Sequence, residues 1–249
     1  MRIAPALLLF QTTFFLDPLF SSYRLMKEIS RVGRIDDSHN EKHSKEVLFW
    51  TIDILRHPKT TKDPLKIKMA AQCALLHDAL DRKYATDFSS TVSDHLQLFH
   101  TEDEVEVMMK IMRTMSYSEI RKNGFPTWIQ ESPYQQLFHI VREADLLSSY
   151  NLARMVEYRR HLGGFTDQKI KDEIVELYDR RMGRLVEHGL FVLPGSAERA
   201  AQLDGIARAK LRMLLTLELH EQNLDILRMV NHLSIFRLVE ELNEIMEDC

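Results

Sequence analysis

The chain has 249 residues, of which 45% are hydrophobic and 28% charged, which is typical of a folded domain and excludes a disordered or low-complexity chain. Its net charge of −4 gives no overall attraction to nucleic acid, so no nucleic-acid partner is expected. Two cysteines, Cys73 and Cys249, are too few for a disulfide framework, and the cytoplasm is the expected compartment.

Residues 1–30 are expected to form an apolar N-terminal segment. Arg2 precedes a mostly apolar run, the order found in a secretory signal peptide. No small-x-small cleavage site follows, and Asp17-Pro18 interrupts the run, so a segment packed on the domain is preferred and secretion is the alternative. The run is too short to cross a bilayer comfortably, and no membrane span is expected.

Two amphipathic helices are expected next, over residues 43–57 and 66–80. In both, apolar residues recur at helical spacing and form one face. The sequence HPKTTKDP, residues 57–64, is a proline-bounded connector between them.

The rest of the chain also has helical periodicity. Further helices are expected over 102–115, 133–161 and 167–187, the last with Thr166 or Asp167 as its N-cap, and one or two long helices over 197–246. No stretch has the sustained alternation of a strand. The predicted fold class is therefore all-α.

Polar residues that can bind a metal interrupt three of these apolar faces. His77 and Asp78 end the second helix, where adjacent side chains diverge by about 100°, so they can share one ion only near the helix end. His43 lies on the apolar stripe of the first helix, and Asp145 on an apolar face in 133–161. Burial of such a carboxylate without a partner costs several kcal/mol, and a metal ion is a common remedy.

The donor types restrict which metal is expected. Two imidazoles and two carboxylates suit one divalent ion, manganese, iron, cobalt or zinc, with coordination positions left open for water and substrate. Because the set contains no cysteine, it does not have the composition of a closed structural zinc site.

In this order, and each on an expected helix, His43, His77-Asp78 and Asp145 resemble the H…HD…D signature of the HD-domain metal-dependent phosphohydrolases. The segments DSHNEKHSKEV, AAQCALLHDALDRKY and VREADLLSSY are similar to the family's first-histidine, central and closing segments. The resemblance covers roughly residues 35–220. HD-x-x-D-x-K and TMSYSEIRKNG are similar to the small single-domain branch, which includes nucleotide pyrophosphohydrolases.

The resemblance implies a compact multi-helix bundle with a metal site between helices. The corresponding domain is residues 31–220, and residues 221–249 are expected to be a helical extension packed on it. The implied activity is hydrolysis of a phosphate ester or anhydride of a small substrate, a class that includes nucleotides, by a metal-activated water.

Two residues beyond the His-Asp pair have expected roles. In related enzymes an acidic residue at the position of Asp81 acts as general acid or base or orients water, and the alternative is a solvated carboxylate. Lys83 is expected to bind a substrate phosphate, with a surface lysine as the alternative. An arginine that the sequence does not single out is expected to assist it. Arg142 or Glu143 would support the metal ligands.

Four further histidines were considered as ligands: His39, His95, His100 and His139. Histidines between Asp78 and Asp145 bind a second metal in dinuclear members of the family, but here they lack the HD-like context. One metal is therefore favoured. The charge runs EYRRH and DRRMGR are interpreted as solvated helix faces rather than nucleic-acid contacts.

Two other functions stay open. The fold could serve as a non-catalytic binding or regulatory module, although such a module has no need for a buried set of four ligands. Some proteins of this fold are di-iron oxygenases, which would require additional histidine ligands. The number of metal ions per chain distinguishes the oxygenase from the hydrolase.

Overall fold

The computed structural model describes residues 5–36, 38–81, 86–230 and 234–247, with side chains from residue 18 onward except 221 and 222. Within these residues the protein is all-α, as predicted, and contains no strand. Its α-helices are α1 (Pro5–Gly33), α2 (Glu41–Leu55), α3 (Pro64–Leu76), α4 (Ser89–Gln97), α5 (Glu102–Thr114), α6 (Tyr117–Asn123), α7 (Gln135–Ser148), α8 (Leu152–Leu162), α9 (Asp167–Arg180), α10 (Ser196–Thr216), α11 (Glu221–Leu227) and α12 (Ile235–Glu247). Short 3-10 helices are η1 (His77–Leu80), η2 (Thr127–Ile129) and η3 (Met182–Arg184).

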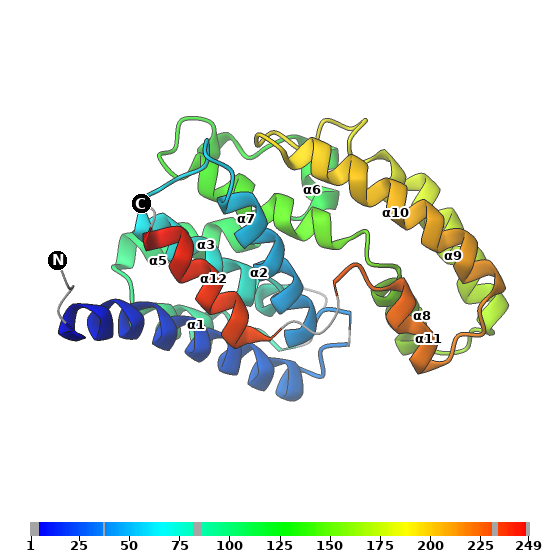
Figure 1. Cartoon of the computed structure of the whole chain (residues 1–249), viewed down its shortest axis with the longest axis horizontal. Helices are drawn as coiled ribbons and strands as arrows, with labels where there is room; N and C mark the ends of the chain where they lie inside the picture. Colours follow the sequence, from blue (N-terminus) through cyan, green and yellow to red (C-terminus); the bar gives the residue numbers. More distant parts are fainter. Residues whose placement is uncertain (1–4, 37, 82–85, 231–233, 248–249) are drawn as a thin grey trace.

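The centre of the molecule is formed by α2, α3 and α7, which pack against one another (Figure 1). Every residue of α3 from 67 to 76 is buried, so this helix has no solvent face. α1 packs against α3, and α12 packs against α1 and α2. The outer helices, α8 to α11, lie together at the other side of the molecule, where α9 and α10 form its edge (Figure 1).

The two central helices begin at polar caps that the sequence places just before their apolar faces. Asn40 Oδ1 accepts a hydrogen bond of 2.8 Å from the Lys42 N–H at the start of α2. Asp63 Oδ1 accepts one of 3.0 Å from the Leu65 N–H at the start of α3, where Pro64 occupies the first turn. Such caps satisfy N–H groups that have no partner within the helix.

The expectation of one helix over 133–161 was wrong. The segment forms two helices, because α7 ends at Ser148 and α8 begins at Leu152. Asn151 caps α8 by accepting from the Arg154 N–H at 3.4 Å, and its amide also donates to Glu46 Oε2 at 2.9 Å. These contacts fix a change of direction that the apolar periodicity does not reveal.

Two boundaries near the C-terminus also differ from expectation. The helix expected over 167–187 ends at Arg180 and is followed by η3, although Thr166 is its N-cap, as one of the two predicted candidates. The region 197–246 contains three helices, α10 to α12, rather than one or two. The first break follows Thr216, where the backbone of Leu217 becomes extended.

The apolar N-terminal segment is part of α1, a helix of 29 residues. Leu19, Met26 and Ile29 of this helix are buried, so its C-terminal half contributes to the core. In the part of the chain that the structure describes, no helix combines the length and the apolar character that crossing a membrane requires.

Candidate metal centre

Four of the predicted site residues converge where the three central helices meet. His43 lies in the first turn of α2, and His77 and Asp78 open η1 directly after α3. Asp145 lies near the C-terminal end of α7. Adjacent side chains within a helix diverge, but His77 and Asp78 lie just after the end of α3. Their side chains can therefore reach the same point, as the sequence predicted.

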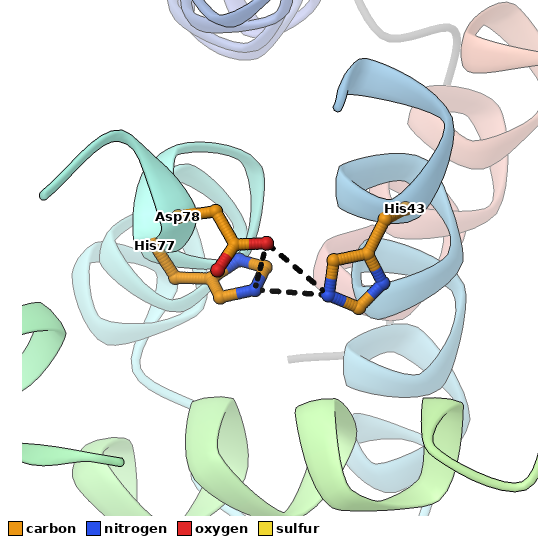
Figure 2. Close-up of side chains that lie close together, drawn as sticks. All are labelled: His43, His77 and Asp78. Atoms are coloured by element: carbon orange, nitrogen blue, oxygen red, sulfur yellow. Dashed lines mark hydrogen bonds and ion pairs between the residues drawn. The ribbon is translucent and has the colours of Figure 1, made fainter. Parts of the chain in front are cut away.

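The donor atoms are separated by distances that suit one shared ion. His43 Nε2 and His77 Nε2 are 3.2 Å apart (Figure 2). Asp78 Oδ2 lies 3.5 Å from His43 Nε2 and 3.4 Å from His77 Nε2. Asp145 Oδ1 lies 3.3 and 3.8 Å from the same two nitrogens. Ligands at about 2.1 Å around a tetrahedral ion are about 3.4 Å apart, so the separations among His43, His77 and Asp78 match a common coordination sphere, and Asp145 lies within reach of both imidazoles.

The cluster is buried on one side and open on the other. His43, His77 and Asp78 are all buried, and their ligand atoms lie within 4.8 Å of one another, so these three could hold a metal ion. The Asp145 side chain is 30% exposed and lies on the open side. Solvent and a substrate can therefore approach the cluster from the side on which Asp145 lies.

A backbone contact fixes the orientation of the His77 ring. His77 Nδ1 lies 2.9 Å from the carbonyl oxygen of Ala74, which can only accept, so Nδ1 carries a proton and donates it. This leaves Nε2 directed at His43 and Asp78. Metal-binding histidines are commonly oriented by such a hydrogen bond from the other ring nitrogen.

The electrostatics of the cluster favour a positive charge at its centre. Burial lowers the pKa of His77, but the carboxylates of Asp78 and Asp145 outweigh burial and raise it. Burial and the charge of Arg154 lower the pKa of His43, which is therefore neutral. Burial would raise the pKa of both carboxyl groups, but the two imidazoles lower it, so Asp78 and Asp145 are ionised.

A buried oxygen of the cluster has no hydrogen bond. Among the described residues, Asp78 Oδ2 is fully buried and accepts none. An unsatisfied buried carboxylate oxygen is costly unless a cation or a donor approaches it. The donor set, its spacing and this oxygen all fit a divalent metal ion.

The cluster forms part of the wall of a cavity of about 760 Å³, to which α5, α6 and the ends of α8 and α9 also contribute. Asp81 lines this cavity and is half-buried, next to the predicted metal ligands. Lys83, the predicted phosphate-binding residue, lies outside the described residues, so its role stays a prediction.

Three of the additional histidines have partners away from the cluster, and the fourth, His39, lies beside His43 with a ring-centre distance of 6.0 Å. His95 bonds Ser22 at 3.0 Å, and His100 bonds Gln72 at 2.5 Å. Arg142 donates to His139 at 3.2 Å. His39 lines the cavity, but its Nδ1 bonds Asp36 at 3.0 Å.

Arg142 and Glu143, considered as support for the metal ligands, bond elsewhere. They form a buried ion pair of 2.8 Å. The Glu143 carboxylate also accepts hydrogen bonds from the N–H groups of Val192 and Leu193, which precede α10. The pair therefore ties α7 to the segment that leads into α10.

Two half-buried arginines that the sequence did not single out line the cavity, in addition to the exposed Arg113. Arg154 of α8 donates to His43 Nε2 at 2.7 Å and to Ser148 Oγ at 3.3 Å. Arg181, at the end of α9, lies over the ring of Tyr117 at 4.1 Å from its centre. The interpretation of DRRMGR as a solvated face was therefore wrong for Arg181, which is half-buried. In the sequence, these two residues are marked only by being arginines, one in the first turn of α8 and one directly after α9.

No family model matches the chain, and neither the curated proteins nor the solved structures contain one that is similar to it.

Proposed function

We propose that the protein is a metal-dependent phosphohydrolase of the HD-domain type, which cleaves a phosphate ester or anhydride of a small substrate. The observation that carries the proposal is the convergence of two imidazoles and two carboxylates in the wall of a cavity of about 760 Å³. This volume is within the range of sites for nucleotide-sized ligands.

The four converging side chains, His43, His77, Asp78 and Asp145, would hold one divalent ion, manganese, iron, cobalt or zinc. When bound, such an ion supplies a Lewis acid toward phosphoryl oxygens and lowers the pKa of water. The exposed side of Asp145 leaves room for the substrate. The order of these residues in the chain matches the signature that the sequence resembles.

Asp81 would supply the proton transfers. It lines the same cavity and is half-buried, so its carboxylate is accessible to a bound substrate. A carboxylate in this position can accept a proton from the attacking water and return it to the leaving oxygen. The half-buried side chains of Arg154 and Arg181 add positive charge to the wall that the phosphate would face.

The test removes one charged ligand without changing its shape. Asp78→Asn should lose its bound manganese, and hydrolysis should fall on the order of a thousandfold, because the metal contributes several kcal/mol to transition-state stabilisation. Metal per chain is measured after equilibrium dialysis, and released phosphate and pyrophosphate are measured with nucleotides and generic phosphoesters. Thermal unfolding checks that the variant is folded.

Asp53→Asn is the matched control, because Asp53 also lies on α2 but pairs with Arg199 at 2.9 Å outside the cavity. It should keep one ion per chain and full activity. Unchanged metal content in Asp78→Asn would place the ion elsewhere. A fully loaded wild type that hydrolyses nothing would favour the non-catalytic module, and two ions per chain would favour the di-iron oxygenase.

A further inference from the structure

The wall of the cavity contains two half-buried arginines, Arg154 and Arg181, in addition to the exposed Arg113. Among the residues described, no carboxylate oxygen lies within 4.0 Å of Arg154 or Arg181. Glu119, an acidic residue of α6 in the cavity wall, is exposed, and its carboxylate accepts a hydrogen bond from the Asn123 amide at 2.9 Å. Asp145 attracts both guanidinium groups through space but forms an ion pair with neither.

The position of Arg181 is fixed although it has no ion pair. Its guanidinium lies 4.1 Å from the centre of the Tyr117 ring, and Tyr117 belongs to α6 on the same wall. Burial lowers the pKa of Arg181; Asp145 and Tyr117 oppose this effect, and the nearby charge of Arg154 adds to it. Two cations that repel each other and are partly desolvated become more stable when an anion binds between them.

Within the described part of the chain, the hydrogen bonds of the Arg154 guanidinium go to neutral side chains, those of His43 and Ser148. One of the acceptors is His43 Nε2, and a metal ion at this nitrogen would use the same lone pair. Metal binding would thus free a hydrogen-bond donor of Arg154 at the edge of the metal centre. A phosphoryl group, with two negative charges and three acceptor oxygens, suits two planar guanidinium groups.

We propose that Arg154 and Arg181 form a phosphoryl-binding site, separate from the His-Asp cluster, that makes the protein prefer substrates with two phosphoryl groups. One group lies at the cluster and is cleaved, and the second lies between the arginines. This preference rests on the proposed hydrolase function, whereas the phosphoryl-binding site itself does not. The second group is either adjacent to the first, as in a diphosphate, or on another part of the substrate, as in a bisphosphate.

The first experiment measures binding without metal or turnover. Chelator-treated protein is titrated calorimetrically with inorganic phosphate. Arg181→Gln should weaken binding by about tenfold or more, because it removes charge-assisted hydrogen bonds. Arg181→Lys keeps the charge but loses the planar pair of donors. Its phosphate affinity should lie between those of the wild type and Arg181→Gln. The control Arg180→Gln changes an exposed arginine of the same helix that pairs with Glu176, and it should bind like the wild type.

Equal phosphate affinity in the wild type and Arg181→Gln would overturn the phosphoryl-binding site. Arg154→Gln gives an independent measurement and should also weaken binding. If either variant does not fold, the other one tests the site alone. Phosphate binding like that of the wild type in the folded variant would reject the site.

The second experiment compares AMP, ADP and adenosine 3′,5′-bisphosphate with manganese-loaded protein. The wild type should have a higher kcat/KM for at least one compound with two phosphoryl groups than for AMP, by about tenfold. Arg181→Gln should remove this difference, because it should lower kcat/KM more for the compounds with two phosphoryl groups than for AMP. ADP and the bisphosphate distinguish adjacent from separate groups.

The two experiments separate the possible failures. Hydrolysis of all three compounds with equal kcat/KM by the wild type would overturn the preference. Hydrolysis of none would overturn the proposed function and the preference with it, while Arg181-dependent phosphate binding would keep the phosphoryl-binding site.

Discussion

The central helices and the outer helices both contribute to the cavity, but they differ in burial. In α7, which contains Asp145, eleven of the fourteen residues are buried, whereas in α8, which contains Arg154, four of eleven are buried. Metal donors must be placed within a few tenths of an ångström, and such precision requires side chains whose neighbours are packed. Long arginine side chains can reach an anion from a less rigid position. The candidate metal centre therefore lies on the more deeply buried part of the protein, and the two arginines come from the more exposed part.

The largest expected difference between the two regions concerns packing. Leu75→Ala in α3 should lower the free energy of unfolding by about 2–5 kcal/mol, because Leu75 is fully buried and its removal leaves a cavity. Leu215→Ala in α10 should change it by less than about 0.5 kcal/mol, since Leu215 is 49% exposed. Urea unfolding measures both. Similar losses would mean that the outer helices are as tightly packed as the centre.

A buried carboxyl group of α2 sharpens the comparison. Glu46 is buried, and burial raises its pKa to about 7 against the nearby charge of Arg154 and the hydrogen bond from Asn151. The folded state therefore binds more protons than the unfolded state between pH 4.5 and 7, and stability falls as the pH rises through this range. The loss amounts to about 3 kcal/mol at pH 8.

Glu46→Gln should remove this loss, so the variant becomes more stable relative to the wild type as the pH rises from 5 to 8. Urea unfolding of chelator-treated protein across this range measures the effect. Glu176→Gln in α9 is the control, because the Glu176 side chain is 72% exposed. Parallel pH profiles for wild type and Glu46→Gln would show that Glu46 has the same pKa in the folded and unfolded states.

The smallest expected effects come from the helix caps. Asn40→Ala and Thr166→Ala each remove an N-cap and should cost about 1 kcal/mol of stability. Only Asn40→Ala should weaken manganese binding, by about tenfold, because His43 lies in the first turn of the helix that Asn40 caps. Equilibrium dialysis compares the two variants. Equal metal affinity would show that the position of His43 does not depend on the cap.

Periodicity and capping residues were sufficient for the fold class and the central helices. The position of His43 on the apolar stripe of its helix predicted its burial, and the buried side chains of His77 and Asp78 follow from the apolar run before them. The break between α7 and α8 was missed, because Asn151 lies within a continuous apolar pattern and its cap depends partly on Glu46, far away in the sequence.

The two half-buried arginines in the cavity wall, Arg154 and Arg181, could not be predicted from the sequence. DRRMGR contains three arginines, and only the tertiary contact of Arg181, directly after α9, with Tyr117 of α6 distinguishes it from the others. Arg154 reaches the cluster because the chain turns at Ser149 to Asn151. Charge runs alone do not reveal which members lose contact with solvent, since this depends on tertiary contacts between helices that are distant in the chain.

The convergence of donors from α2, η1 and α7 would also link a bound metal to the folding equilibrium. An unfolded chain cannot bring these three segments together, so an ion binds the native state far more tightly than the unfolded ensemble. At a free metal concentration a thousand times the dissociation constant, this linkage adds about 4 kcal/mol of stability. Resistance to heat and to proteases should therefore follow the metal supply, and a thermal melt in a series of metal buffers would measure the occupancy of the proposed centre without any substrate.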